Sequence, residues 1–520
     1  MPKPLAPWWE IPRPHPRSSG FSRFRANVPV LSATAATPTA LNVYQARCEV
    51  EADDINTPIR IVSHFSSTET ILAISSMGGW KDRTPFLQYI VNTEPAGRPE
   101  KYTTENSFSV GLAGIAHHTA IDPSRKLLFT GDSDRVKSFE WGRPGTEGGF
   151  HKKAEAVHTF DSDGFDGPML VLGDGRFIRA GNGKMGVWNL NELAQETHAM
   201  YGKKPIGGRK INVEDTWRDD PEAIDRARGT AVGQTMNLWI PNLKPAVMKH
   251  HPSGTPNLVL FGAEFDEGNL GLDPRAQYSC VILDIEQGKP VSKILGHGDS
   301  VTEFSTSSAD PNAFVTGCED GYARLFDVRT HFPVITFDAA YREEACSAVA
   351  LAHPDGIPSL FTGLESGEHI KFWDIRAKAV VYDLGTGNNA VGSIAWDERK
   401  QVLYAATACH HITRHGGRMD YRKLKVPRPP KSARDSKKPT DGEDQDMGDD
   451  EDEGDWEDVE DDEDELEDLG ESGDDGQGWP KKAQHAEDYY PHLFDAASHR
   501  LFRYSFKTEP SPDVLPQNDW

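Results

Sequence analysis

The 520-residue sequence predicts an all-β fold made of repeated units of short strands, and three observations support that prediction. The chain has 47 glycines and 36 prolines, and long helical patterns are scarce. One pattern recurs: an apolar strand, a turn of small and acidic residues, and an alternating strand that ends on an aromatic residue. Asp284, Asp327 and Asp374 occupy equivalent positions in these units, 43 and 47 residues apart. This period is the one expected for the four-stranded blades of a β-propeller.

The clearest copies of the pattern are "FVTGCEDGYARLFDVR" at residues 314–329 and "LFTGLESGEHIKFWDIR" at residues 360–376. Looser copies occupy residues 128–141, 176–190, 279–297 and 489–506. Together they predict a single seven-bladed propeller. Its blades are expected near residues 41–105, 106–160, 161–245, 246–296, 297–340, 341–386 and 387–507.

Two of these blades depart from the regular period. The third contains an insertion in which "DDPEAIDRARG" predicts a short helix, with Asp220 as N-cap, Pro221 at the first helical position and Gly229 as the stop. The seventh is split, and residues 487–507 supply its closing strands. Because a propeller must close its ring, a chain truncated before these strands is predicted to lose its fold.

The repeats resemble those of the WD-repeat β-propeller family over about residues 41–507. Gly296 and His297 match the Gly-His of that repeat, and Trp373 with Asp374 matches its Trp-Asp pair. Degenerate pairs stand at Phe326 with Asp327 and at Trp188 with Asn189.

The resemblance implies a hydrogen-bonded set of His, Ser or Thr, Asp and Trp inside a blade. His297, Thr316 and Asp320 match the first three members, but Phe326 replaces the tryptophan and cannot donate a hydrogen bond. In the next blade Trp373 is present, although no Gly-His precedes it.

The net charge of −25 is concentrated in one segment. Residues 441–476 contain 23 Asp or Glu and no Lys or Arg, which leaves the rest of the chain at −2. This balance argues against a broad nucleic-acid-binding surface. Residues 414–438 carry ten basic residues, so residues 413–486 are predicted to be a disordered insertion, basic and then acidic.

Three interpretations of this insertion stay open. In the first, the insertion is a solvated loop whose basic and acidic halves partly neutralise each other. In the second, its basic part is a nuclear localisation signal. In the third, its acidic part binds a basic protein such as a histone or ribosomal protein. For the third interpretation, four apolar residues would lie within about 140° of one another on a helical wheel. They are Trp456, Val459, Leu466 and Leu469.

The remaining parts of the chain are a Pro-rich N-terminal arm, residues 1–40, and a C-terminal tail, residues 508–520. The propeller blades up to the start of the seventh occupy residues 41–412. Five widely spaced cysteines without a Cys-x-x-Cys pair indicate a reducing compartment, nucleus or cytoplasm. The sequence contains no run of about 18 apolar residues, so it predicts no membrane span.

The sequence contains no convincing catalytic, cofactor or metal motif. "GNGKMG" at residues 181–186 matches a dinucleotide-binding glycine pattern, but a strand-like "VWNL" follows where a helix is required. Cys409, His410, His411 and His415 could bind a metal but lie beside the charged insertion, without a second cysteine or a carboxylate nearby. We therefore predict a non-enzymatic protein with no cofactor.

Two consecutive blades end on Asp-x-Arg: Asp327 with Arg329, and Asp374 with Arg376. These boxes resemble the tandem Asp-x-Arg boxes of WD-repeat substrate receptors, which bind the adaptor of cullin-four ubiquitin ligases. The resemblance implies that the two guanidinium groups contact that adaptor, since arginine can bind carboxylates and carbonyls through two N–H groups. The alternative is that each arginine pairs with a neighbouring acid for structural reasons.

The sequence thus predicts a non-catalytic protein-interaction scaffold, a monomeric propeller that works within a complex in the nucleus or cytoplasm. Its leading specific function is a cullin-ligase substrate receptor that uses the Asp-x-Arg boxes. The alternative is a nuclear chaperone or assembly factor that binds basic proteins through the acidic segment. An enzyme without a recognisable motif is a remote third.

Overall fold

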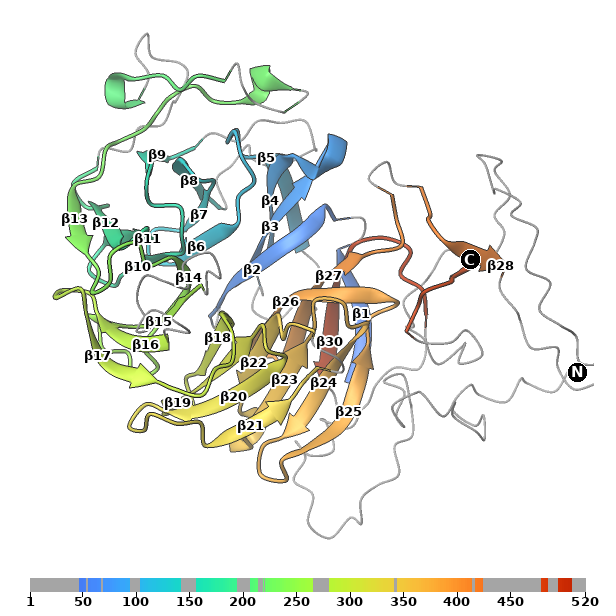
Figure 1. The fold of residues 1–520 in the computed structure, drawn as a ribbon. Coiled ribbons are helices and arrows are strands. Elements are labelled where there is room, and N and C mark those ends of the chain that lie inside the picture. Colours follow the sequence, from blue (N-terminus) through green and yellow to red (C-terminus); the bar gives the residue numbers. More distant parts are fainter. Residues whose placement is uncertain are drawn as a thin grey trace, which may run out of the picture.

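The computed structural model describes residues 46–506 except 53–54, 67–68, 94–102, 142–155, 194–205, 214–217, 219, 265–279, 341–343, 414–416, 424–477 and 485–493. Within these residues, seven antiparallel four-stranded sheets surround a common centre (Figure 1). The predicted seven-bladed propeller is confirmed. No helix in the described part of the chain is long and apolar enough to cross a membrane.

Six blades each use four consecutive strands. Blade 1 consists of β2 (Thr57–Phe65), β3 (Glu69–Gly78), β4 (Thr84–Thr93) and β5 (Thr103–Ser109). Blade 2 consists of β6 (His118–Asp122), β7 (Leu127–Gly131), β8 (Arg135–Glu140) and β9 (His158–Asp161). Blade 3 consists of β10 (Met169–Val171), β11 (Arg176–Gly181), β12 (Lys184–Asn189) and β13 (Gln234–Asn237).

Blade 4 consists of β14 (Pro245–His250), β15 (Leu258–Ala263), β16 (Cys280–Asp284) and β17 (Lys289–Ile294). Blade 5 consists of β18 (Val301–Ser307), β19 (Asp310–Cys318), β20 (Tyr322–Asp327) and β21 (Ile335–Asp338). Blade 6 consists of β22 (Ala348–Ala352), β23 (Ser359–Gly363), β24 (His369–Asp374) and β25 (Ala379–Gly385). Blade 7 is assembled from β26 (Asn389–Asp397), β27 (Val402–Cys409), β30 (Arg500–Phe506) and β1 (Ala46–Ala52).

The first strand of each blade lies at the centre of the ring. These inner strands contact one another in the order β2, β6, β10, β14, β18, β22, β26 and back to β2. An inner strand is also the edge strand of its sheet. The N–H groups on its unpaired edge, which faces the centre of the ring, therefore need partners from outside that sheet. Side chains of neighbouring blades supply some of them: Ser393 Oγ accepts from Ile61 N at 3.2 Å, and Ser305 Oγ accepts from Leu351 N at 2.9 Å.

The core lies between the blades, because each sheet is covered on both faces by its neighbours. Aromatic side chains fill the contact between blades 2 and 3: the rings of Phe129 and Phe177 stack 4.9 Å apart, and Phe160 lies 5.1 Å from Phe177. Trp188 closes this cluster and is almost fully buried. The repeated strand that ends on an aromatic residue therefore supplies the packing between blades.

The ring is closed by pairing the first described strand, β1, with the last one, β30. β1 pairs with β30, and β30 pairs with β27, so the N-terminal strand is the outer strand of the last blade. The sequence prediction placed residues 41–105 together in the first blade. That boundary is wrong for β1, since residues 57–109 provide all four strands of blade 1. An ion pair between Arg503 and Glu51 at 3.1 Å also joins β30 to β1.

The helix predicted in the blade 3 insertion is reduced to one 3-10 turn, Pro221–Ala223. The Asp220 carboxylate does not cap it, because Arg218 donates two hydrogen bonds to that carboxylate at 2.9 and 2.8 Å. Gly229 does not act as a helix stop: its φ is +104°, and a Cβ there would lie 2.7 Å from the Thr159 carbonyl oxygen. The glycine lets the insertion pass closely over β9.

The predicted disordered insertion, residues 413–486, has ordered ends. β28 (Tyr421–Lys423) and β29 (Gly478–Pro480) pair with each other as a short ladder outside the blades. The Trp479 side chain is 1% exposed. Residues 424–477, which hold the acidic segment and most of the basic one, lie outside the described residues.

Candidate functional site

The topology places the two Asp-x-Arg boxes on one face of the ring. Each box follows the third strand of its blade, β20 or β24, and these strands run in the same direction because blades 5 and 6 have the same strand order. The charged insertion joins the second and third strands of blade 7, so it leaves the ring on the opposite face. We call the face with the boxes the box face.

Each box holds its arginine against its own aspartate. Arg329 donates to the Asp327 carboxylate through Nε at 2.8 Å and through Nη2 at 2.5 Å. Arg376 makes the same two contacts with Asp374 at 3.2 and 3.1 Å. The hydrogen bonds from Arg329 lower the pKa of Asp327 to about 2. The arginine side chains are 72% and 60% exposed, so both guanidinium groups remain accessible to a partner.

The WD-type hydrogen bonds are divided between two blades. In blade 5, His297 Nε2 and Thr316 Oγ1 lie 3.0 Å apart, and Phe326 packs against the imidazole at a ring distance of 5.3 Å. In blade 6, Trp373 Nε1 donates to Thr362 Oγ1 at 2.9 Å. Thr362 is not among the residues predicted from the sequence, although it aligns with Thr316 in the two clearest copies of the pattern.

Asp320 does not take the role that the resemblance implies. Arg324 donates to its carboxylate at 3.0 and 2.7 Å, and Gly298 N donates at 2.7 Å. Among the described residues, His297 Nδ1 has no hydrogen-bond partner. Burial lowers the pKa of His297 to about 4, so the imidazole is neutral at pH 7. Arg324, four residues after Asp320, competes successfully for that carboxylate.

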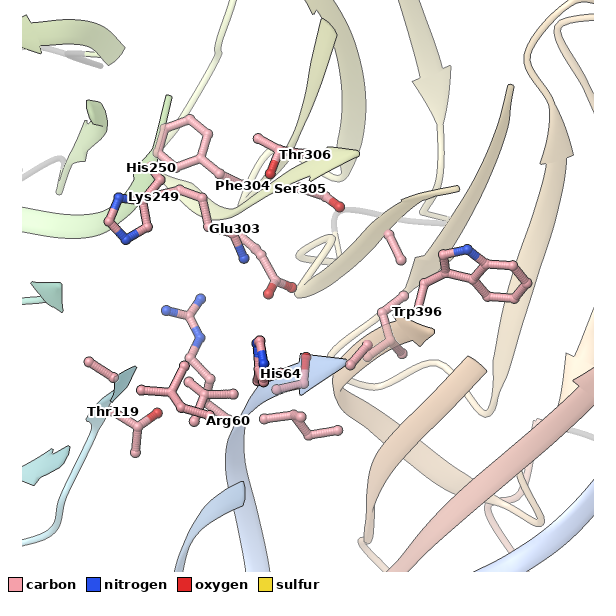
Figure 2. A pocket seen from close by; sticks show the side chains of 18 of the residues that line it. Arg60, His64, Thr119, Lys249, His250, Glu303, Phe304, Ser305, Thr306 and Trp396 are labelled. Atoms are coloured by element: carbon pink, nitrogen blue, oxygen red, sulfur yellow. The ribbon is translucent and has the colours of Figure 1, made fainter. Parts of the chain in front are cut away.

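A cavity of about 700 Å³ occupies the centre of the ring, and all seven inner strands contribute to its wall (Figure 2). It also includes Ser308, Glu398 and Arg399, which follow inner strands β18 and β26. Turns after inner strands lie on the box face, as do turns after third strands, because alternate strands of a meander run in the same direction. The cavity and the Asp-x-Arg boxes therefore share one face.

Three charged side chains from different blades point into this cavity: Arg60 of β2, Lys249 of β14 and Glu303 of β18 (Figure 2). Arg60 Nη2 donates to the Thr302 carbonyl oxygen at 2.9 Å, on a blade that is not its neighbour. Glu303 Oε2 accepts from Val349 N at 3.3 Å. Sequence reasoning missed these residues because no motif links different blades. The available signal was a charge inside an otherwise apolar strand, as in "PIRIVSHF".

The remaining candidate residues do not form a metal centre in the described part of the chain. There, no group of three or more His, Cys, Asp or Glu side chains is arranged to hold a metal ion. His411 Nε2 lies 3.6 Å from Glu368 Oε1, and Cys409 is buried. His415 falls outside the described residues, as do Trp456, Val459, Leu466 and Leu469.

Comparisons with known proteins return partial matches. No family model matches the chain. The Periodic tryptophan protein 1 homolog of Drosophila melanogaster is 22% identical over 131 residues, 25% of this chain and 28% of that protein. The U3 small nucleolar RNA-associated protein 15 homolog of Xenopus tropicalis is 26% identical over 136 residues, 26% of this chain and 25% of that protein. The chain thus matches about a quarter of the length of these curated relatives.

A solved structure described as the WD40 β-propeller domain of Doa1 covers 69% of this chain and 93% of its own length. Its TM-score is 0.43 and its sequence identity is 10%. The strand order of the present chain is, by itself, that of a seven-bladed β-propeller. Its His297–Thr316 and Trp373–Thr362 contacts are of the kind that the WD-repeat resemblance implies.

Proposed function

We propose that this propeller is a non-catalytic assembly factor of the nucleus, which holds a basic protein through the acidic segment, residues 441–476. The observation that carries the proposal is the attachment of that segment. The two strands that flank it in the sequence, β28 and β29, pair with each other, so the two ends of the stretch that contains the 23 carboxylates are held together. One relative is named for its association with U3 small nucleolar RNA, which supports a nucleolar setting.

The contacts around β28 and β29 support this attachment in detail. Tyr421 Oη donates to Asp495 Oδ2 at 2.8 Å, and Lys481 N donates to the Asp420 carbonyl oxygen at 2.7 Å. Gln484 binds blade 6 twice, through its N–H to Glu368 Oε2 at 2.8 Å and through Nε2 to the Ser366 carbonyl oxygen at 3.0 Å. An anionic segment on such a base attracts a cationic protein at long range, and salt weakens that attraction.

Replacing every Asp and Glu between residues 441 and 476 by Asn or Gln is expected to weaken binding of purified core histones or a basic ribosomal protein at least tenfold. The reason is that the replacement removes all 23 carboxylates while keeping the length of the segment. Affinity would be measured by fluorescence anisotropy at two salt concentrations. The thermal unfolding midpoint should stay unchanged, since the segment lies outside the blades.

A second variant separates charge from apolar contact in the same assay. Changing Trp456, Val459, Leu466 and Leu469 to serine keeps the charge, so weaker binding would support a segment that folds on its partner. Equal binding by the wild-type protein and the charge-neutralised variant would refute the proposal.

We keep a second candidate function, a substrate receptor of a cullin ligase, because of one observation. Arg329 and Arg376 both remain mostly exposed on the same face, although each also contacts its own aspartate. An adaptor carboxylate or carbonyl would compete with that aspartate for the guanidinium group.

The double change Arg329→Ala with Arg376→Ala is expected to reduce recovery of the purified ligase adaptor at least tenfold in a pull-down. The matched control is Arg176→Ala, which removes an arginine that also pairs with an aspartate two residues away, at 2.7 Å. Both proteins should unfold at the wild-type temperature, because exposed ion pairs add little stability. Recovery of the adaptor by the double variant at the wild-type level would exclude this function.

A further inference from the structure

We propose that the central cavity binds a small oxyanion, a phosphorylated or carboxylated molecule, between Arg60, Lys249 and Glu303. The inference is independent of the proposed function, which concerns the opposite face of the ring. It rests on the position of these three groups, on their unused hydrogen-bonding capacity and on the shape of the cavity.

The first observation is an ammonium group without a hydrogen bond or a close ion pair. Among the described residues, Lys249 makes no hydrogen bond, and no carboxylate oxygen lies within the 4.0 Å of an ion pair. Glu303 faces it from the neighbouring blade at a longer distance (Figure 2). Lys249 is exposed to solvent within the cavity, so its ammonium group is available to an anion that enters. Its position among the inner strands lowers the pKa of Lys249, and the nearby Glu303 carboxylate opposes that shift.

The second observation concerns the other donors around the same space. Figure 2 shows the Arg60 guanidinium directed into the cavity, where one of its N–H groups reaches the Thr302 carbonyl oxygen. A planar guanidinium and an ammonium group are donors that phosphate and carboxylate groups accept from.

The third observation is the charge balance. Arg60 and Lys249 carry two positive charges against the single carboxylate of Glu303, and Glu398 with Arg399 at the mouth contributes no net charge. Glu303 is also partly used, because Oε2 accepts from Val349 N. Its second oxygen can accept from a hydroxyl or amine of the ligand. The cavity therefore fits a molecule with one oxyanion and one hydrogen-bond donor.

The size of the cavity agrees with a metabolite. A volume of about 700 Å³ falls in the range of small-molecule sites, roughly 300–1,000 Å³. His64, His118 and His250 add ring nitrogens to the wall. Burial lowers the pKa of His250, and burial, Arg179 and Arg60 lower that of His118, so these two rings stay neutral at pH 7 and can accept or donate a hydrogen bond.

The test is calorimetric titration of the full chain with pyrophosphate and with citrate at constant ionic strength. We expect the wild-type protein to bind at least one probe with a submillimolar Kd. Lys249→Gln should weaken that binding about tenfold, because it removes a charge-assisted hydrogen bond. Glu303→Gln should strengthen it several-fold, because it removes the nearby negative charge and leaves an amide oxygen for Val349 N.

Lys293→Gln is the matched control, since Lys293 is an exposed lysine on the outer strand of the same blade as Lys249. It should bind like the wild-type protein, and circular dichroism should show that all variants are folded. Two results would overturn the proposal. One is the lack of heat from either probe at millimolar concentration, and the other is a Lys249→Gln variant that binds as well as the Lys293→Gln control.

Discussion

Replacing Tyr504 by alanine is expected to lower the free energy of unfolding by about 3–5 kcal/mol, the cost of removing a large buried aromatic side chain. Tyr504 lies at the middle of β30, is fully buried, and is paired with Cys48 of β1 on one side and Leu403 of β27 on the other. Its hydroxyl donates to the Gly385 carbonyl oxygen at 2.7 Å. The change therefore acts where the two parts of the chain close the ring.

Urea unfolding measured by tryptophan fluorescence would give the free energies. Tyr504→Phe is the control, because it keeps the ring and loses one hydrogen bond, for a cost of about 1 kcal/mol. If the free energy of unfolding of the alanine variant fell by less than about 1 kcal/mol, β30 would add little to the closure of the ring. Truncation before residue 487 should then also leave a folded protein, against the prediction made from the sequence.

Arg179→Ala is expected to cost about 3 kcal/mol or more, because several buried acceptors lose their donor together. Arg179 lies on β11 and is completely buried. It donates to Ser162 Oγ at 2.6 Å and to the carbonyl oxygens of Asp132, Asp166 and Gly167 at 2.6, 3.2 and 3.1 Å. These acceptors belong to blade 2 and to the connection into blade 3, so one side chain fastens two blades.

Burial lowers the pKa of Arg179 to about 10, which leaves the guanidinium charged at neutral pH. Arg176→Ala on the same strand is the control, since Arg176 is partly exposed and binds Asp174 and Glu286 at the surface. Exposed pairs of this kind contribute less than about 1 kcal/mol. The prediction fails if the two variants have the same urea midpoint.

The repeated pattern was sufficient to predict the propeller and the number of its blades. Each blade carries its own strand and turn signals, and the aromatic ends of the third strands, such as Trp188 and Trp373, are the residues that pack between blades. The pairing of β1 with β30 was not predictable in the same way. An alternating segment such as "ARCEVEA" indicates a strand but does not indicate which sheet it joins.

Two local predictions failed because a nearby arginine changed the outcome. Asp220 has the sequence position of a helix N-cap, yet its carboxylate is bound by Arg218. Asp320 has the position of a WD-repeat aspartate, yet Arg324 binds it. In both places the arginine donor and the aspartate acceptor are both charged, whereas in the hydrogen bond that the pattern anticipates only the aspartate is charged.

The residues of the candidate site were also predictable from the sequence only in part. The Asp-x-Arg boxes could be found because each is contiguous in the sequence and recurs one blade later. Arg60, Lys249 and Glu303 could not be grouped, because they belong to three blades and meet only when the ring has formed. The interface residues of the acidic segment stay a prediction.

The pairing of β1 with β30 also has a consequence for the synthesis of this protein. β1 leaves the ribosome before every other described strand, and its partner leaves after every other one. At roughly 5–20 residues per second, β1 waits on the order of 25–90 s for β30. During that time the apolar residues of β1 are exposed to other chains, and the open edge of β27 is exposed for roughly the last 5–20 s. A nascent-chain chaperone that binds near residue 46 would therefore raise the yield of folded protein.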